Sequence, residues 1–552
     1  MFMFTVRTYF IIAGLLIAGV LPGSGQTVCE PWAATDGRGR NVPGAKECGP
    51  PRADRFVGIF YFIWMGTHEQ QGPYNITEIL KQPAQSRKWG GGGQFHWWDQ
   101  PRLGYYLSND EWVIAKHAQL LSDAGVDVVV LDVTNGFTYD EYYLTVCKVY
   151  REIRAAGGKT PQIAFLTNSR GKEVTQRIYQ DFYQKNLYAE IWFQWKGKPL
   201  IMTNPEGLPN EILDFFTIRH SWAWSNPKGW FGNGKDKWPW IDYFPQAYGW
   251  HESPDQAEYV PVTVAEHAAN GVGRSQRNGR KPPPSEQDPG AGLHFQEQWD
   301  RALKIDPEFI FITGWNEWIA QRFIAETPRP FAGGAVKPGE TWFVDAYNHE
   351  YSRDIEPLNG GFEDNYYYQM VSNIRKFKGV AQECSWHDDL GDTRQRNHPG
   401  FASAGPYTNN WGRNDIVSCD VSVNESNLVF SAETSETLTK PKDTTWMNLL
   451  IRNPREPGDN WEGFQFRIRP ESRTSAVFEQ RVSNEWKKIA DIKAACSSRK
   501  IRLSIPRDVL GKSFQTLEFK WFDNMPEPLD ILDFMDHGDT APNNRFRYVF
   551  EK

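Results

Sequence analysis

The sequence predicts a (β/α)8 TIM barrel followed by a C-terminal antiparallel β-sandwich domain, and three observations support this fold class. Apolar strands of the doubly buried kind alternate with amphipathic helices over residues 55–380. Polar residues directly follow several of these strands, at the end that faces the active site in such barrels. After about residue 400 the pattern changes to short alternating segments separated by Pro, Gly and Asn turns, which is typical of antiparallel sheets.

The barrel elements follow from apolar runs and from apolar residues at helical spacing. Helices are predicted where one face is apolar, as for Ile114, Ala118 and Leu121, and Asp364 is placed at the start of the last barrel helix. Strands are predicted at residues 56–62, 126–131, 162–166, 199–202, 215–218, 260–264 and 309–312, with a further segment beginning at 240–244.

The chain divides into four parts. Arg7, an apolar run over residues 9–21 and a small-residue zone predict a signal peptide at 1–25. Residues 26–54 form an irregular lead-in, 55–380 the barrel, and 381–552 the β-sandwich, which we expect to be carbohydrate-binding-like. We therefore expect a protein that is secreted, periplasmic or on the cell surface, with no stable membrane span once it is processed.

Composition narrows the class of function. The net charge is −7 with both signs abundant, so nothing favours nucleic acid as a partner. The chain holds 24 Trp, and such flat aromatic surfaces suit carbohydrate as well as protein cores. In the later domain, Trp446, Trp461 and Trp521 fit either a sugar platform or a core. The six cysteines permit disulfides in an exported chain, with Cys29 and Cys48 close enough in sequence to pair.

No cofactor is predicted. The cysteines show no zinc spacing, and no Gly-rich phosphate loop appears. A structural Ca²⁺ in the acidic C-terminal tail is compatible with the sequence, which shows no recognisable ligand spacing for it.

Four carboxylates at expected strand ends are candidates for catalysis: Asp132, Glu252, Glu266 and Glu317. Glycoside hydrolysis uses two carboxyl groups, and their separation decides between inversion and retention. Glu317 lies between tryptophans and an asparagine, where apolar walls raise a carboxyl pKa and favour proton transfer. Each of the other three, taken alone, is also compatible with a structural loop carboxylate.

Neutral polar and aromatic residues at the same strand ends form the predicted substrate-binding set. Any one of them could instead pack in the core, but a ring of them suits a sugar site. The set is Tyr61, Trp64, His96, Asn135, Asn168, His220, Trp222, Tyr248, Trp250, His251, Trp315, Asn316 and Arg322. A basic loop with Arg274, Arg277, Arg280 and Lys281 fits either an acidic sugar or a solvated charge run.

Two segments resemble a known family. Phe-Ile-Thr-Gly-Trp-Asn-Glu-Trp at 311–318, followed by Glu-Tyr-Ser-Arg-Asp-Ile-Glu-Pro at 350–357, resembles the glycoside hydrolase family 99-like and WbsX-type barrel proteins. The resemblance covers the barrel alone, and it implies a (β/α)8 fold, an α-linked glycan substrate and a role for Glu317. The endo-α-mannosidase branch has a second Glu three residues after the first, where this chain has Ala320. Its retaining mechanism is therefore not inherited.

The sequence as a whole predicts an exported glycoside hydrolase acting on a polysaccharide or complex glycan. Glu317 would act as acid or base, with a partner sought first at Glu252, then Glu266, then Asp132, and Asp132 would stabilise the charged transition state. Two alternatives stay open: a non-catalytic glycan-binding protein on a degenerate barrel, and a polysaccharide lyase whose basic loop neutralises a uronate.

Overall fold

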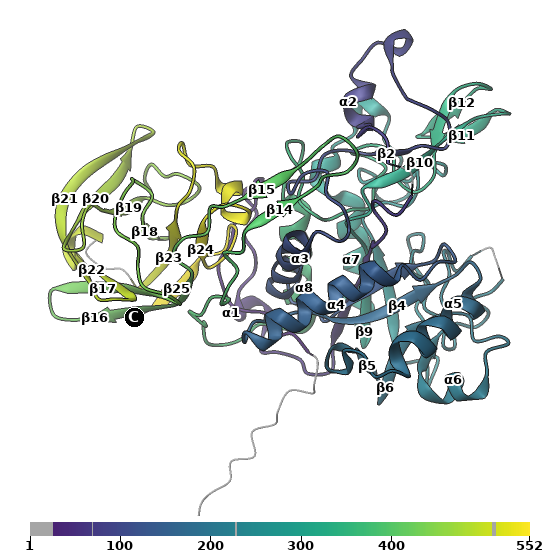
Figure 1. The fold of residues 1–552 in the computed structure, drawn as a ribbon, viewed down its shortest axis with the longest axis horizontal. Coiled ribbons are helices and arrows are strands. Elements are labelled where there is room, and N and C mark those ends of the chain that lie inside the picture. The colour runs from purple at the N-terminus through teal and green to yellow at the C-terminus, as the bar shows by residue number, and fades with distance from the viewer. Residues whose placement is uncertain (1–25, 69, 227–228, 511–514) are drawn as a thin grey trace, which may run out of the picture.

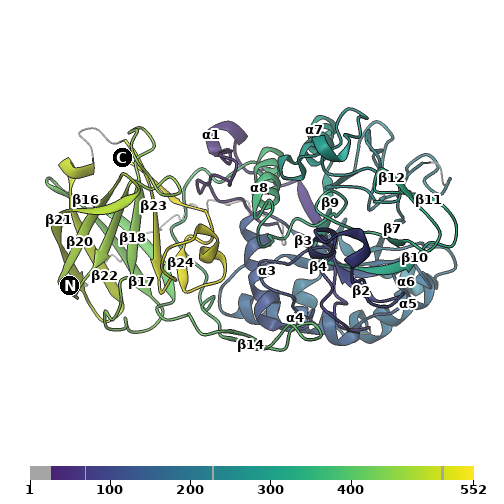
Figure 2. The ribbon, with the colours of Figure 1, turned by 90° about the horizontal axis from the view of Figure 1, so that it is seen from above.

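The computed structural model describes residues 26–68, 70–226, 229–510 and 515–552, and it shows two bodies side by side (Figure 1; Figure 2). The larger body is an α/β barrel, and the smaller is built from antiparallel strands. The predicted signal peptide at 1–25 lies outside the described residues. Among the described residues, no helix is both long enough and apolar enough to cross a membrane.

Seven parallel strands form the barrel sheet within the described part of the chain, in the order β7-β6-β4-β3-β1-β9-β8. Almost every residue of the central strands is buried, because helices cover one face and the barrel interior the other. The strands are β1 Phe56–Tyr61, β3 Val128–Val133, β4 Gln162–Thr167, β6 Lys198–Met202, β7 Thr217–Arg219, β8 Tyr259–Thr263 and β9 Phe309–Trp315. A short antiparallel hairpin joins β5 Gln194–Trp195 to β6.

An irregular segment fills the gap between β7 and β8. Lys237 and Ile241 form isolated parallel bridges with His220 and Ala223, just beyond the end of β7. On the other side, the Trp238 ring stacks on a tyrosine of β8 at 4.5 Å between centroids. Residues 237–241 therefore take the place of the remaining barrel strand, although they form no regular ladder.

Helices cover the outside of the barrel in the order that βα units require. They are α3 Glu111–Asp123, α4 Asp140–Ala155, α5 Gly171–Ile178, α6 Asn210–Phe215, α7 Leu293–Ile305 and α8 Asn365–Lys378. Asp110 caps α3, since its side chain accepts the amides of Trp112 and Val113. Asp364 precedes α8 as predicted, but its carboxylate bonds Arg545 instead of capping the helix.

Long excursions stand above the carboxyl ends of the barrel strands (Figure 1). A three-stranded sheet joins β2 Phe95–Trp97, β10 Ile319–Ile324 and β13 Thr341–Phe343. The same region holds α2 Ile76–Leu80 and the hairpin of β11 Arg329–Phe331 with β12 Gly334–Val336. These excursions supply the upper walls of the candidate site.

The C-terminal body is one continuous antiparallel sheet instead of two separately paired sheets. Its strand order is β16-β17-β22-β21-β20-β19-β18-β23-β24, and β25 pairs with β23. The first and last strands meet where the Ile416 amide donates to Asp539 Oδ2 at 2.6 Å, so the sheet is nearly closed. The strands are β16 Ile416–Val423, β17 Asn427–Thr434, β18 Asn448–Arg452, β19 Phe466–Pro470, β20 Ser475–Val482, β21 Glu485–Cys496, β22 Lys500–Pro506, β23 Thr516–Asp523, β24 Asp539–Ala541 and β25 Tyr548–Glu551.

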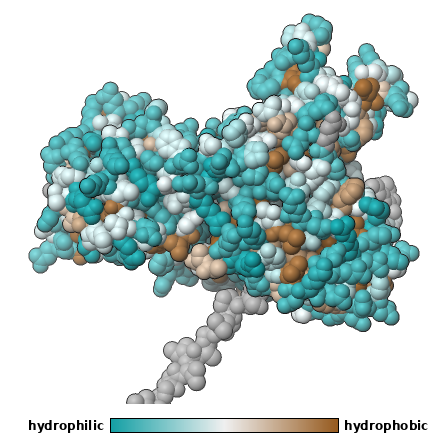
Figure 3. Space-filling view, viewed as in Figure 1, coloured by the Kyte–Doolittle hydropathy of each residue, from teal (hydrophilic) through white to brown (hydrophobic). Residues whose placement is uncertain are grey.

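Tryptophans of this domain lie mostly in its core. Trp446 and Trp521 are fully buried, which rules them out as a sugar platform, and Trp461 is half-buried against Phe464 and Phe534. The exposed face in Figure 3 is mainly hydrophilic, with scattered apolar residues.

Charged contacts hold the two bodies together. Arg102 of the barrel pairs with Asp533 and Asp536 of the C-terminal domain, at 2.7 and 3.0 Å. Arg545 pairs with Asp364 at 2.6 Å, and the predicted lead-in adds a backbone bridge between Ala33 and Arg547. The cysteines at 29, 48, 147, 384, 419 and 496 are all unbonded, so the suggested bond between Cys29 and Cys48 is not formed.

Candidate active site

Glu317 lies two residues beyond β9, at the carboxyl end of the barrel. Its residue exposure is 8%, and both carboxylate oxygens accept hydrogen bonds from Arg353 Nη2, at 2.8 and 3.0 Å. The Glu317 amide donates to Asp354 Oδ1. Backbone and side chain are therefore both held in place, as a catalytic carboxyl group requires.

Burial and the charge of Arg353 shift the pKa of Glu317 in opposite directions. Burial raises the pKa of this carboxyl to about 8, against the lowering effect of Arg353, and three neighbouring carboxylates add to the rise. These neighbours are Asp345, Asp354 and Asp132. Because one guanidinium faces several carboxylates, Glu317 keeps its proton at neutral pH.

Arg353 is the central cation of the site. It is 2% exposed and contacts Asp345 Oδ1 at 3.2 Å in addition to Glu317. Its Nη1 donates to the carbonyl oxygens of Glu266 and Asp345, and its guanidinium lies 5.4 Å from the centre of the Trp240 ring. Neighbouring carboxylates raise the pKa of Arg353 despite its burial, so it stays charged.

Asp132 occupies the corresponding place at the end of β3. Its Oδ2 accepts the Trp64 indole N–H at 2.8 Å, and its Oδ1 accepts the Thr134 amide at 3.0 Å. Burial raises the pKa of Asp132, while these donors work against the rise. The same hydrogen bond fixes the half-buried Trp64, whose ring stacks with Tyr139 at 6.1 Å.

Asp345 is the accessible carboxylate of the group. Its side chain is 45% exposed, and its backbone has φ of 70°, which is uncommon for a residue other than glycine. It shares Arg353 with Glu317, and His267 Nε2 accepts its backbone amide at 3.4 Å. Among the carboxylates around Glu317, Asp345 is therefore the one that solvent or a ligand can reach most directly.

Glu266 belongs to the site as a support. It has no solvent exposure, its Oε2 accepts the Trp224 indole N–H at 2.8 Å, and His294 lies 3.7 Å from Oε1. Burial raises the pKa of Glu266. This carboxylate positions Trp224, which stacks on the partly exposed Tyr243 at 5.6 Å.

The prediction for Glu252 is wrong, because this residue lies at the opposite end of the barrel. It precedes β8, lines a surface pocket with Arg55 and Glu308 at the amino ends of β1 and β9, and its side chain is 80% exposed. The residues before it share this location, since Gly249 pairs with Tyr259 at the start of β8. Three predicted substrate-binding residues lie there with it: Tyr248, Trp250 and His251.

Three other predicted binding residues are structural. The Tyr61 hydroxyl bonds His117 of α3 at 2.9 Å, and the fully buried Trp315 ring packs on the same histidine. The Asn316 side chain bridges the Phe62 amide and carbonyl, at 2.8 and 2.9 Å, and so ties the end of β9 to that of β1. These side chains hold the loop that carries Glu317, but they do not line a ligand site.

Two more belong to the sheet above the barrel. His96 is buried and stacks on Tyr74 at 4.9 Å, with a ring nitrogen 2.6 Å from the Trp89 carbonyl. Arg322 donates to the Gly90 carbonyl at 2.6 Å and to the Thr341 hydroxyl. Both therefore hold the excursion over the site together.

The remaining predicted residues lie at or beyond the carboxyl ends of strands. Asn135 and Asn168 are exposed, after β3 and β4, and Trp222 is half-buried after β7. His220 directly follows β7, and its Nδ1 lies 2.6 Å from Lys237 Nζ of the irregular strand. Burial lowers the pKa of His220 to about 4. Asn135, Asn168 and Trp222 keep their place at this end of the barrel, whereas His220 is engaged with the irregular strand.

The sequence reasoning missed Arg353 and Asp345 as site residues. Arg353 lies within the Glu350–Pro357 segment that carried the family resemblance, so a signal existed. Asp345 follows a short strand of the excursion, β13, and not a barrel strand, so a search confined to barrel strand ends could not find it. Within the basic loop, Arg274 has a structural role, because it is buried against Tyr366 and donates to the Asp354 carbonyl at 2.7 Å.

Comparisons with known proteins give little further guidance. No protein-family model matches the chain, and no curated protein matches it. Among solved structures, the GH99 endo-alpha-mannosidase from Bacteroides thetaiotaomicron is similar at 15% identity with a TM-score of 0.34, covering 59% of this chain and 97% of that one. Its complex with BIS-TRIS-propane gives the same values. A similarity this low is not evidence for a shared activity.

Proposed function

We propose that the protein is an exported glycoside hydrolase in which Glu317 is the general acid. The observation that carries this proposal is a buried carboxyl group at a barrel strand end, held by Arg353 and with its pKa raised to about 8. A carboxylic acid that keeps its proton at neutral pH can give it to the oxygen of a leaving sugar. This chemistry needs an ionised carboxylate as its partner.

Asp345 is the partner that fits best. It is exposed, and it contacts the same guanidinium nitrogen as Glu317, so the two carboxyl groups lie close together at one end of Arg353. Asp132 is bound by two N–H donors and supplies negative charge near the developing oxocarbenium ion. Glu266, without exposure, acts only by positioning Trp224.

The proposed step balances in protons and bonds. The bond between the anomeric carbon and the leaving oxygen breaks, and that oxygen takes the proton of Glu317. In the inverting form, a water molecule adds to the anomeric carbon and passes a proton to Asp345. In the retaining form, the Asp345 oxygen first bonds to the anomeric carbon; water then displaces it, and the ionised Glu317 takes the proton of that water.

Aromatic surfaces around these groups suit a sugar ring. Trp64 and Trp224 are each fixed by a carboxylate through the indole N–H, and both are half-buried, so part of each ring is exposed. Tyr243 is 37% exposed beside Trp224. Sugar C–H faces pack on such rings, which supports a glycan as the substrate class.

The lyase alternative loses part of its support. It required a basic loop free to neutralise a uronate, but Arg274 is buried among aromatic rings and Arg280 pairs with Glu286, whereas Arg277 and Lys281 are exposed. The glycan-binding alternative is separated from a hydrolase by whether a product forms.

Digestion of a polysaccharide panel tests the proposal. Wild-type protein should release reducing ends from at least one α-linked glycan, and Glu317→Gln and Asp345→Asn should each lower the rate by about 10²–10⁴-fold. Glu252→Gln is the matched control, because this residue is exposed at the far end of the barrel, and its activity should equal that of wild type. Binding without product would support the non-catalytic alternative, and equal rates for Glu317→Gln and wild type would refute the role of Glu317.

A further inference from the structure

Three carboxylates meet at the seam of the C-terminal sheet, far along the chain from the residues of the candidate active site. Asp388 and Asp392 come from the segment that links the barrel to this domain, and Asp539 begins β24. One oxygen of each lies within 4.8 Å of one oxygen of the others. The seam is the place where β16 and β24, the two ends of the strand order, come together.

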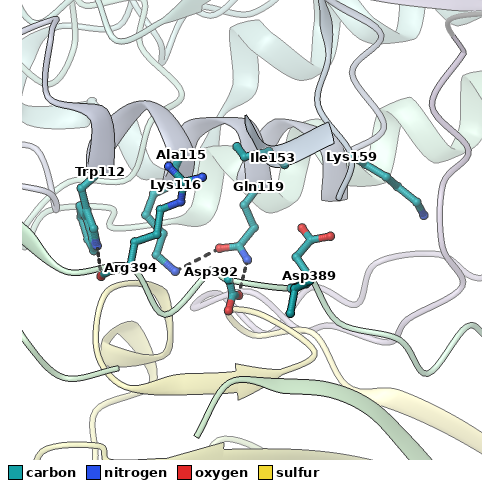
Figure 4. A pocket seen from close by; sticks show the side chains of 11 residues that line it. Trp112, Ala115, Lys116, Gln119, Ile153, Lys159, Asp389, Asp392 and Arg394 are labelled. Carbon is teal, nitrogen blue, oxygen red and sulfur yellow. Dashed lines mark hydrogen bonds between the residues drawn. The ribbon is translucent and has the colours of Figure 1, made fainter. Parts of the chain in front are cut away.

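Each carboxylate has a neutral hydrogen-bond donor. Asp539 accepts the Ile416 amide at 2.6 Å, Asp388 accepts from Asn543 at 3.2 Å, and Asp392 accepts from Gln119 of α3 at 2.6 Å (Figure 4). Asp388 Oδ2 and Asp392 Oδ1 are cut off from solvent and accept no hydrogen bond from the described residues. Two buried oxygens are thus left without a partner, which is costly for charged groups.

No basic side chain among the described residues pairs with these three carboxylates within 4.0 Å. Lys116 bonds Gln119 Oε1 and Lys520 bonds the Pro542 carbonyl, so the charges of these two lysines act on the cluster only from beyond ion-pair distance. Lys159 pairs with Glu30. Further acidic groups add negative charge to the region, namely Asp123, Asp389 and Asp415.

The three carboxylates bring negative charge together without an ion pair to any described basic side chain. Either protons or a cation must offset this repulsion in the folded protein at neutral pH.

A second acidic cluster in the same domain provides the contrast. Asp533, Asp536 and His537 also bring their ligand atoms within 4.8 Å of one another. Arg102 already neutralises that cluster, with ion pairs of 2.7 and 3.0 Å, and the pKa of Asp536 is lowered. The cluster at the seam has no such arginine within ion-pair distance among the described residues.

We propose that Asp388, Asp392 and Asp539 bind a hard divalent cation, with Ca²⁺ as the best fit. Carboxylate oxygens are its preferred ligands, and oxygens about 2.3–2.6 Å from a Ca²⁺ ion are separated by up to roughly 5 Å across it. The spread of 4.8 Å or less at the seam satisfies this limit. The ion fastens β24 and the linker together, and through Asp392 and Gln119 it fastens both to the outside of the barrel.

Thermal unfolding of the full-length protein after treatment with a chelator tests the site. Ca²⁺ at about 100 times its dissociation constant should raise the Tm by roughly 5–10 °C, with one ion bound per chain by calorimetric titration. The double variant Asp388→Asn with Asp392→Asn should lose most of this rise. It should still fold, because removing two charges relieves the repulsion between the carboxylates.

Asp536→Asn is the matched control, since it removes one acid from the cluster that Arg102 neutralises. Its Tm should fall, but the Ca²⁺-dependent rise should equal that of wild type. The proposal is overturned if chelated wild type shows no rise with Ca²⁺, or if the double variant shows the full rise. A Tm that increases from pH 7 to pH 5 without responding to Ca²⁺ would also overturn it, because protons would then hold the cluster. Binding of Mg²⁺ but not Ca²⁺ would refute the choice of ion.

Discussion

Replacing Glu317 by Gln should stabilise the protein increasingly as the pH rises, because the wild-type carboxyl group keeps a proton that the unfolded chain releases. The pKa of Glu317 is raised from 4.5 to about 8 in the folded protein. The contribution of this protonated group to the free energy of unfolding is fully present below about pH 4.5 and is lost as the pH rises toward 8. Between these values, wild type loses about 1.4 kcal/mol of unfolding free energy per pH unit, relative to a residue that does not titrate.

From pH 5.5 to pH 7.5 the difference between Glu317→Gln and wild type should therefore grow by about 2–3 kcal/mol in favour of the variant. The Gln oxygen can still accept from Arg353, and Asp345 still balances the guanidinium charge, so the substitution leaves no unpaired buried cation. Urea denaturation of both proteins at several pH values between 5 and 8 measures this difference.

Glu326→Gln serves as the reference for charge removal, because Glu326 is an exposed residue on the excursion above the barrel. Its stability relative to wild type should not change across this pH range. A pH-independent difference for Glu317→Gln would refute the reasoning, since Glu317 would then be ionised throughout as a simple ion pair with Arg353.

The remaining predictions concern activity and the contact between the domains. The kcat/KM of the wild-type hydrolase should fall above about pH 8, as Glu317 loses its proton, and a profile that stays flat to pH 9.5 would contradict its role as acid. Arg353→Met should move this alkaline limb to higher pH, because Arg353 lowers the pKa of Glu317, whereas Arg353→Lys should move it less; a limb that stays in place in both would contradict the assignment. Arg102→Ala should lower the Tm by several degrees at unchanged kcat, as it removes two partly buried ion pairs worth about 1–3 kcal/mol, and an equal Tm by calorimetry would show that they contribute nothing.

Much of the barrel could be predicted because burial on both faces leaves a direct mark on sequence. Runs such as 128–131 and 309–312 are wholly apolar, and the structure places both in parallel strands that have a neighbouring strand on each side. The segment at 237–241 gives no such run, since Lys237 and Pro239 interrupt it, and it forms no regular ladder. Because this segment gives no recognisable strand end, the sequence predicts Glu252 at the carboxyl end of the barrel, whereas the structure places it at the amino end.

The C-terminal domain shows a different limit. Alternating segments predict antiparallel strands correctly, because alternate residues face the core and solvent. They do not reveal whether the strands form two sheets or one, since this depends on which edges meet in space. The contact between Ile416 and Asp539 closes the sheet across more than a hundred residues of sequence, and nothing local to either residue indicates it.

The candidate site was predictable at the carboxylates that follow barrel strands, but not at the partner of Glu317. Glu317 follows a barrel strand directly, so its position could be inferred from the strand alone. Its chemistry depends on residues from elsewhere: Arg353 and Asp354 come from the loop before α8, and Asp345 from the end of the excursion. One arginine shared between Glu317 and Asp345 cannot neutralise both in a buried site that also holds Asp132 and Asp354, so burial and the excess of negative charge favour the protonated form of Glu317. In the proposed mechanism, Asp345 therefore takes the role for which the sequence offers no second acid at Ala320. The protonation of Glu317 follows from the excess of carboxylates over the single guanidinium of Arg353.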